Sequence, residues 1–314
     1  MNGIVIIDKP AGKTSHDIVS EVKKILGAKK AGHTGTLDPM ATGVLPVCLN
    51  EATKLAQFLS GESKEYAATM LLGVKTDTLD AEGKITAKSD KVVSDEEIKA
   101  ALAKMVGKIS QVPPAFSAVK YGGKPLYKYA RKGVFLKTAA REVEIFNIAI
   151  QKISFPRVTF MIACSKGTYI RQLCSDVGEL LGCGACLIGL RRLRSGFFSE
   201  DMAVSLDNYG YAEKKVELVK KMLSMTKSLP LFAAMEVAED LATKLRAGFQ
   251  PSVEMMKAHV PPFLEAGDML KFISYSGNLV ALVEMIIPVN KFPEFDGKCQ
   301  AAKIIRVFNN NISN

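Results

Sequence analysis

The sequence predicts a mixed α/β protein with a large N-terminal domain, residues 1–230, and a small C-terminal unit, residues 231–314. Short apolar strands alternate with amphipathic helices through the first part of the chain, which indicates a mixed architecture. After Leu229-Pro230-Leu231 the pattern changes to short strands separated by turns. The chain has 314 residues, 48% of them hydrophobic, so it is long and apolar enough for one large core and one small core.

Each predicted element has a local signal. Residues 3–8 form an apolar strand, and Thr14 with Asp17 makes a capping box for a helix that Gly27 ends. The other elements predicted for the N-terminal domain are a helix over 51–59, a strand over 64–74, a capped helix over 94–107, a strand over 157–165, a helix with an apolar stripe over 170–181 and a charged helical connection over 207–227. Those of the C-terminal unit are a helix over 237–247 and strands over 267–275, 278–287 and 303–308.

Residues 32–54, GHTGTLDPMATGVLPVCLNEATK, carry the strongest chemical signal. Glycine and proline recur so often from Gly35 to Pro46 that this part is predicted to be a shaped loop. Its one acidic side chain, Asp38, has apolar neighbours. Asp-Pro pairs also start turns, but a carboxylate in an apolar frame is costly unless it is paired or used, which favours a nucleophile or general base. A phosphorylated-aspartate loop is excluded, because its nucleophile would stand where the chain has Gly32.

A second chemical signal lies where the strand over 157–165 leads into a helix. Tyr169 and Arg171 fall in the first turn of that helix, off its apolar stripe. Cations favour the other end of a helix, so an arginine at this position requires an anionic partner. We expect Arg171 to pair with Asp38 and to keep that carboxylate ionised and oriented.

The positive charge is concentrated in one third of the chain. Residues 101–200 hold 16 basic and 5 acidic side chains, a surplus of +11, whereas the other residues together sum to −1. Within residues 113–133, lysines and arginines such as Lys120 and Arg131 alternate with aromatic rings. Cations beside rings are typical of surfaces that bind single-stranded RNA, although the rings are also suited to a core. A solvated basic face is the alternative, but the concentration favours a nucleic-acid partner.

The remaining composition indicates a cytoplasmic protein. No basic-then-apolar leader is present at the N-terminus, and the most apolar late run, residues 279–289, is too short and too interrupted to cross a membrane. The six cysteines are therefore expected to be reduced. Cys183 and Cys186 have metal or redox spacing, but no second cysteine pair or nearby histidine completes a zinc site.

The loop closely resembles a motif of the TruB family, the tRNA pseudouridine synthases that modify uridine 55 of the T-arm. The family pattern G-H-T-G-x-L-D-P-x-A-T-G-x-L is met at every fixed position by residues 32–45. Further family segments match at Lys9-Pro10, at Lys64-Glu65-Tyr66, at residues 76–83, at residues 113–131, at residues 165–171 and at residues 190–196.

The resemblance implies roles for individual residues. Asp38 would be the catalytic aspartate, Arg171 its partner, and Tyr66 a ring that stacks on the target base and serves in proton transfer. The residues implied to bind substrate or RNA are Lys9, His33, Lys54, Lys120, Arg131, Tyr169, Leu190, Arg191 and Arg192, with Leu190 lining the uracil pocket.

The resemblance also implies a pseudouridine synthase fold with a mixed, mainly antiparallel sheet, followed by a PUA-like RNA-binding barrel. The reaction would be isomerisation of uridine in the tRNA T-arm, with the target base flipped out of its stack. It needs no cofactor and no metal, and we expect a monomer without an obligate protein partner. The alternatives are a non-catalytic RNA-binding or folding factor, and a pseudouridine synthase with another RNA target or working in a guide-RNA complex.

Overall fold

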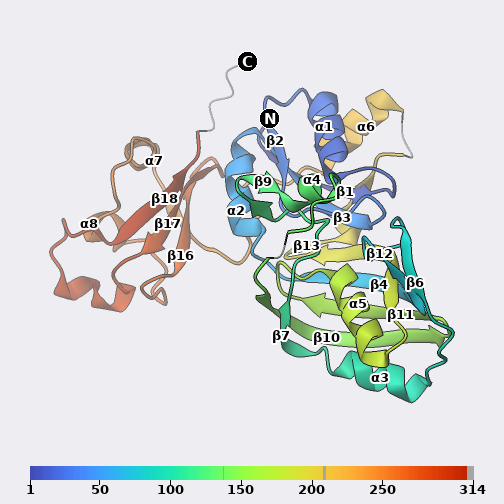
Figure 1. Ribbon diagram of the computed structural model, residues 1–314. Helices are drawn as coiled ribbons and strands as arrows, with labels where there is room; N and C mark the ends of the chain where they lie inside the picture. The colour runs from blue at the N-terminus through green and yellow to red at the C-terminus, as the bar shows by residue number, and fades with distance from the viewer. Residues whose placement is uncertain (137, 208–209, 310–314) are drawn as a thin grey trace.

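The computed structural model describes residues 1–136, 138–207 and 210–309 (Figure 1). The strands of its large sheet are β1 (Gly3–Lys9), β2 (Ala31–His33), β3 (Thr42–Leu49), β4 (Lys64–Leu72), β7 (Gly107–Gln111), β10 (Arg141–Ser154), β11 (Arg157–Cys164), β12 (Ala185–Ser195), β13 (Phe198–Ser199) and β14 (Val204–Ser205). Two hairpins lie outside this sheet, β5 (Val74–Thr76) with β6 (Ile85–Lys88) and β8 (Lys120–Tyr121) with β9 (Lys124–Pro125).

The helices of the same part are α1 (Ser15–Leu26), η1 (Asn50–Leu55), α2 (Ala56–Leu59), α3 (Asp95–Ala103), α4 (Leu126–Ala130), α5 (Ile170–Leu181), η2 (Glu200–Met202) and α6 (Tyr211–Lys220). The C-terminal unit contains β15 (Ala233–Val237), α7 (Glu239–Arg246), α8 (Val253–Met256), β16 (Met269–Ser274), β17 (Leu279–Met285), η3 (Val289–Glu294) and β18 (Ala302–Val307). Parts of two predicted segments, residues 208–209 of the charged connection and residues 310–314 of the C-terminal unit, lie outside the described residues.

The large sheet has the strand order β14-β1-β3-β12-β4-β11-β10-β7, with β2 beside β3 and β13 beside β12. Within the described residues, β1 with β14 and β3 with β12 pair in parallel, and the other neighbours pair antiparallel. The predicted mixed α/β class with a mainly antiparallel sheet is therefore confirmed. Figure 1 shows α5 across one face of the sheet, where it packs against β12 and β4.

The capped helices form as the sequence predicts. In α1, Thr14 accepts from the amide of Asp17, the Asp17 carboxylate accepts from the amide of Thr14, and Gly27 ends the helix in the left-handed region at φ 62°. The same reciprocal bonds join Ser94 and Glu97 at the start of α3. The apolar stripes face the core, with two exceptions that correct the prediction. Val106 lies beyond the end of α3 and is exposed, and Leu180 of α5 is 55% exposed.

The predicted loop from Gly35 to Pro46 is only half right, because β3 starts at Thr42 and passes through both Gly43 and Pro46. Gly43 has φ 96°, and a Cβ there would lie 2.2 Å from the Arg192 carbonyl oxygen, so only glycine permits this approach of β3 to β12. Proline has no N–H to donate to a neighbouring strand. Pro46 lies one residue past the last pair between β2 and β3, where β3 needs no amide donor toward β2. The true loop is residues 34–41.

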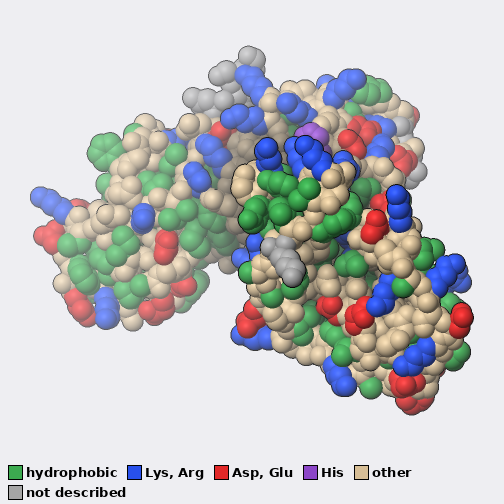
Figure 2. Space-filling view, in the orientation of Figure 1, with side chains coloured by type: hydrophobic (Ala, Val, Ile, Leu, Met, Phe, Trp, Pro, Cys, Tyr) green, Lys and Arg blue, Asp and Glu red, His purple; other side chains and the backbone are tan. Residues whose placement is uncertain are grey.

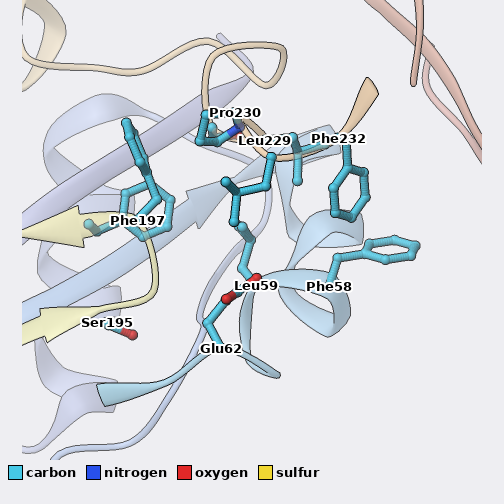
Figure 3. A pocket seen from close by; sticks show the side chains of 11 residues that line it. Phe58, Leu59, Glu62, Ser195, Phe197, Leu229, Pro230 and Phe232 are labelled. Atoms are coloured by element: carbon cyan, nitrogen blue, oxygen red, sulfur yellow. The ribbon is translucent and has the colours of Figure 1, made fainter. Parts of the chain in front are cut away.

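The C-terminal unit is a four-stranded sheet in the order β15-β16-β17-β18 with its own apolar core. It also shares a core with the larger part: Leu279, Leu282 and Phe308 pack in one cluster with residues of β1 and β3. At the junction the rings of Phe58 and Phe232 meet edge to face with centroids 6.3 Å apart (Figure 3). The two parts are therefore packed together rather than joined by a free linker.

No helix among the described residues is long and apolar enough to cross a membrane.

Candidate active site

The loop of residues 34–41 presents Asp38 from a backbone that is fixed beside the first turn of α1. The Ser15 hydroxyl donates to the carbonyl of Leu37 at 3.0 Å and accepts from the Leu37 amide at 2.8 Å. Leu37 itself is buried, and the amide of Ala41 donates to the Asp38 carbonyl at 3.1 Å, which closes a turn. The residue before Asp38 is thus held by side chain and backbone contacts at once, so the carboxylate has a defined position.

Asp38 and Arg171 form the ion pair that the sequence predicts. The Nη2 of Arg171 donates to Oδ1 of Asp38 at 3.0 Å, and its Nε lies 2.9 Å from Oδ2. The Arg171 side chain is 5% exposed, whereas that of Asp38 is 31% exposed. A two-point contact with a planar guanidinium fixes the orientation of a carboxylate as well as its charge. The carboxylate therefore keeps an accessible side toward solvent while its back is held.

The rest of the Arg171 guanidinium is occupied by two other segments. Its Nη1 donates to the carbonyl of Thr78 at 2.9 Å and lies 3.3 Å from Oδ2 of Asp80, and its Nη2 donates to the carbonyl of Phe116 at 2.9 Å. These contacts involve all three nitrogens of the guanidinium: Nη1 and Nη2 donate hydrogen bonds, and Nε lies near Oδ2 of Asp38 without forming one. One buried side chain thus joins the Asp38 loop, the turn after β5 and the segment before β8.

The surroundings of Asp38 act in opposite directions on its titration. Burial raises the pKa of the Asp38 carboxyl above its ordinary value of 3.8, the Arg171 guanidinium opposes that rise, and the nearby Asp80 carboxylate adds to it. Two carboxylates around one guanidinium make a strongly coupled group. Such perturbed groups in a partly open position are typical of catalytic sites.

Lys9, which the sequence predicts to bind RNA, is enclosed by the protein. It is 0% exposed, and its Nζ donates to the carbonyls of Pro10, Lys13 and Pro39 at 2.7, 2.7 and 3.1 Å. An ammonium group has three donors, so none is left for a phosphate. Burial lowers the pKa of Lys9 to about 8. Because Pro39 follows Asp38 directly, Lys9 instead holds the far side of the Asp38 loop.

Arg192 is enclosed by the protein in a similar way. It is 1% exposed and donates to the carbonyls of Val44 at 2.7 Å, Gly35 at 3.0 Å and Thr36 at 3.5 Å. Successive side chains of a strand point to opposite faces, and the adjacent Arg191 is accordingly 38% exposed. Arg191 pairs with Asp8 at 2.9 Å and with Glu200 at 3.2 Å. Arg192 therefore supports the Asp38 loop by binding its backbone carbonyls, and Arg191 remains at the surface in an ion-pair network.

Lys54 is directed to the C-terminal unit. Its Nζ lies 2.8 Å from Oε2 of Glu51, donates to the Val307 carbonyl at 3.1 Å and lies 5.9 Å from the centre of the Phe308 ring. The same Glu51 carboxylate accepts from the amide of Asn309 at 2.9 Å. These contacts place Lys54 in the junction between the two parts of the chain, and its RNA-binding role stays a prediction.

The remaining predicted residues occupy three different environments. Tyr66 of β4 is 8% exposed, and burial raises the pKa of its phenol, which the nearby Arg192 partly offsets. His33 is half-buried, its Nδ1 has no hydrogen-bond partner among the described residues, and burial lowers its pKa. Tyr169 and Leu190 are half-buried as well. Tyr169 precedes α5, and Leu190 packs against the main core from β12.

Lys120 and Arg131 are exposed, and no ion pair involves either residue in the described part of the chain. The guanidinium of Arg131 lies 5.4 Å from the centre of the Tyr127 ring. In Figure 2 Lys and Arg side chains gather beside hydrophobic ones on the upper part of the face, where Figure 1 places α1, α4 and β9. This surface has the composition that the sequence predicts for an RNA-facing region.

Sequence reasoning missed several residues that build the site. Asp80 contacts Arg171, Ser15 contacts the backbone of Leu37, and Gln111 holds the backbone of Tyr169. Asp80 lies in a segment whose acidic, turn-rich character was visible, and its 4% exposure in the fold is what identifies it as a partner of Arg171. In the described residues no group of three or more His, Cys, Asp or Glu is arranged to hold a metal ion, and Cys183 and Cys186 are buried free thiols.

Comparisons with known proteins agree with this arrangement. Residues 23–170 match the TruB family pseudouridylate synthase N-terminal domain, and residues 171–225 match the tRNA pseudouridylate synthase B C-terminal domain. The tRNA pseudouridine synthase B of Syntrophus aciditrophicus (strain SB) is 49% identical over 308 residues, 98% of this chain and 99% of the relative. That of Geobacter sulfurreducens (strain ATCC 51573 / DSM 12127 / PCA) is 39% identical over 310 residues, 98% of this chain and 100% of the relative.

Solved structures show the same fold. A chain in the crystal structure of a Cbf5-Nop10-Gar1 complex aligns with a TM-score of 0.73 and 29% identity, covering 98% of this chain and 85% of that one. Fold, loop motif and paired carboxylate define an RNA-modifying isomerase. The chain belongs to the TruB family of tRNA pseudouridine synthases. It is accordingly an enzyme that converts uridine to pseudouridine.

Proposed function

We propose that this enzyme isomerises uridine 55 in the T-arm of tRNA and that Asp38 is the reacting carboxylate. The observation that carries the proposal is the two-point contact of Asp38 with Arg171, formed by a loop that meets the T-arm family motif at every fixed position. The names of the relatives, tRNA pseudouridine synthase B, support tRNA as the substrate. A tRNA substrate is expected in the cytoplasm, and the proposal places the enzyme there.

The reaction needs positioning more than it needs outside reagents. The bond between N1 of uracil and C1′ of ribose breaks, the base rotates, a bond forms between C5 and C1′, and the hydrogen of C5 is replaced by one on N1. Atoms and electrons balance without an oxidant or a carrier. Asp38 must be ionised to act as a nucleophile or base, and Arg171 favours the ionised form.

Binding of the RNA must first remove the target base from its stack, which costs a few kcal/mol. We assign the compensating contacts to the exposed cations of residues 118–133, including Lys120 and Arg131, and to a stacking ring, Tyr66. His33, Tyr169 and Leu190 would surround the flipped nucleotide. We further propose that residues 231–314 are a PUA-like RNA-binding domain, and that the enzyme works as a monomer without an obligate protein partner.

The test is incubation of the purified protein with an unmodified tRNA transcript, followed by mapping of pseudouridine along the RNA. We expect modification at position 55 and none in a transcript with that uridine replaced by cytidine. Asp38→Asn preserves the size of the side chain, so it should keep RNA affinity but lower the single-turnover rate by at least about 10⁴-fold, as the removal of a nucleophile does. Product at wild-type rate from this variant would contradict the mechanism.

A further inference from the structure

The backbone of Tyr169 is held by a buried side chain from the far edge of the sheet. Gln111 is the last residue of β7, lies 58 positions before Tyr169 in the sequence and is 2% exposed. Its Oε1 accepts from the Tyr169 amide at 2.8 Å, and its Nε2 donates to the Tyr169 carbonyl at 3.1 Å. A side-chain amide offers one acceptor and one donor group together, so it matches both backbone groups of a single residue.

These bonds hold the residue just before the first turn of α5, at a helix end that lacks a side-chain cap. Tyr169 is the N-cap residue of α5, and no side chain caps that end through a local hydrogen bond. Helix N-termini without a cap are free to fray or shift. The start of α5, and with it Arg171 two residues further on, is therefore fixed by Gln111 from another element.

The chain that follows Gln111 contacts the same turn a second time. The carbonyl of Phe116 accepts from Arg171 at 2.9 Å, and the segment then continues into β8 and α4 with Lys120 and Arg131 at the surface. Residues 111–116 thus bind the first turn of α5 at two points, once at the backbone of Tyr169 and once at the guanidinium of Arg171.

We propose that Gln111 is a positioning residue for catalysis, which sets where Arg171 meets Asp38 by holding the backbone of Tyr169. The inference rests on the proposed role of Asp38 and adds to it a residue that does not touch the substrate. Gln111 acts through the helix start, so its loss should affect the chemical step and leave RNA contacts intact.

The first test compares Gln111→Met with wild type in steady-state assays over a range of tRNA concentrations, which give kcat and KM, and in single-turnover assays at saturating tRNA, which give the rate of the chemical step. Methionine has a similar length and no hydrogen-bonding amide, so the Tyr169 amide loses Gln111 as its acceptor, and the Tyr169 carbonyl loses one of two donors and keeps the Leu173 amide at 3.0 Å. We expect kcat to fall about 10²-fold, the scale of a 1 Å misplacement, with KM for tRNA nearly unchanged. Gln172→Met is the matched control, because Gln172 lies on the same helix and its amide donates only to Asp176, at 2.8 Å. It should stay within about twofold of wild type.

A second variant gives a signature that loss of stability alone would not produce. In Gln111→Glu the ionised carboxylate still accepts from the Tyr169 amide, but it repels the Tyr169 carbonyl oxygen. The protonated carboxyl can donate a hydrogen bond to that carbonyl. Burial favours protonation. The deficit relative to wild type at each pH should therefore shrink as the pH falls.

The proposal is overturned if Gln111→Met keeps kcat within twofold of wild type, if Gln172→Met loses as much, or if the Gln111→Glu deficit does not change with pH. Asp38→Asn tests the proposed function separately. If wild type modifies a uridine other than position 55, the same rates are measured at that uridine, so the substrate assignment fails without affecting the result for Gln111.

Discussion

The basic side chains around the Asp38 loop and those of the segment 118–133 have opposite surroundings. Lys9, Arg171 and Arg192 are buried and donate hydrogen bonds to oxygen atoms of the protein itself. Lys120 and Arg131 are exposed and form no ion pair among the described residues. A buried cation with occupied donors cannot reach a phosphate, whereas an exposed one keeps its donors for an anionic partner. The first group should position the catalytic loop, and the second should bind RNA.

The largest effect should come from changing a buried cation without changing its charge. In Arg171→Lys a single ammonium cannot make the two-point contact with Asp38 and also reach the carbonyls of Thr78 and Phe116. We expect the single-turnover rate to fall by about 10²-fold or more, since misplacement by 1 Å has that effect. Pseudouridine formation at saturating tRNA measures it.

The matched control is Arg131→Lys, which also retains charge but stands at the surface. It should change the single-turnover rate by no more than about twofold. Equal losses in Arg171→Lys and Arg131→Lys would remove the distinction between the two groups.

The next effect is on stability and concerns Lys9. Lys9→Met removes the shared donor of the Pro10, Lys13 and Pro39 carbonyls. The Pro39 carbonyl keeps the Gly12 amide at 2.9 Å, and each of the two acceptors left unsatisfied costs about 1–3 kcal/mol. We expect the free energy of unfolding to fall by about 2–5 kcal/mol, measured by denaturant titration. In the control variant Lys120→Met, the free energy of unfolding should lie within about 0.5 kcal/mol of the wild-type value. An unchanged stability of Lys9→Met would mean that the three contacts do not hold the loop.

A smaller effect, on pH dependence, tests the charges that face Asp38. Burial raises the pKa of Asp38, and the Asp80 carboxylate adds to that rise. As the pH decreases, wild-type activity should therefore begin to fall at a pH above 3.8, the ordinary pKa of an aspartate. In Asp80→Asn the like charge is removed, the pKa of Asp38 falls and the acid limb should move to lower pH. The measurement is the single-turnover rate against pH. A shift to higher pH would show that Asp80 acts on Asp38 mainly by holding Arg171.

The sequence predicted those parts of the site whose signals are local. The capping boxes and the strand holding Tyr66 follow from spacing and periodicity. The pairing of Asp38 with Arg171 spans 133 positions, and it was inferred because each charge requires a partner rather than from a local signal. The 14-residue strand β10 was missed, because β-bulges next to Asn147 and Lys152 interrupt its alternation. Strand alternation alone would have placed Arg191 and Arg192 on opposite faces.

Other parts depend on contacts between distant segments and could not be predicted locally. Lys9 and Arg192 lie in segments that match the family, and only the fold shows that carbonyl oxygens surround them. Only the fold places Lys54 beside Glu51 and the Val307 carbonyl. Gln111 has no local signal, since its partner is 58 residues away. The boundary near residue 230 and the PUA-like character of the C-terminal unit stay predictions.

The smallest expected effect concerns the exposed cations and the salt dependence of RNA binding. Each lost phosphate contact should lower the slope of log K against log salt by about 0.7–0.9. Arg131→Gln should therefore reduce that slope by up to this amount and leave the single-turnover rate at saturating tRNA unchanged. Removal of the C-terminal unit is unsuitable for this purpose, because Phe308 and Leu282 belong to a core shared with the larger part.

The control for Arg131→Gln is Lys303→Gln, an exposed lysine on β18. Residues 251–314 contain 6 basic and 6 acidic side chains, so this unit has no net charge with which to attract RNA. Its contacts to tRNA should depend on shape rather than on counterion release. Salt titrations of both variants on one tRNA separate the two regions. If Lys303→Gln lowers the slope of log K against log salt as much as Arg131→Gln does, the C-terminal unit also binds RNA electrostatically. That result would contradict a division in which the segment 118–133 supplies the electrostatic binding.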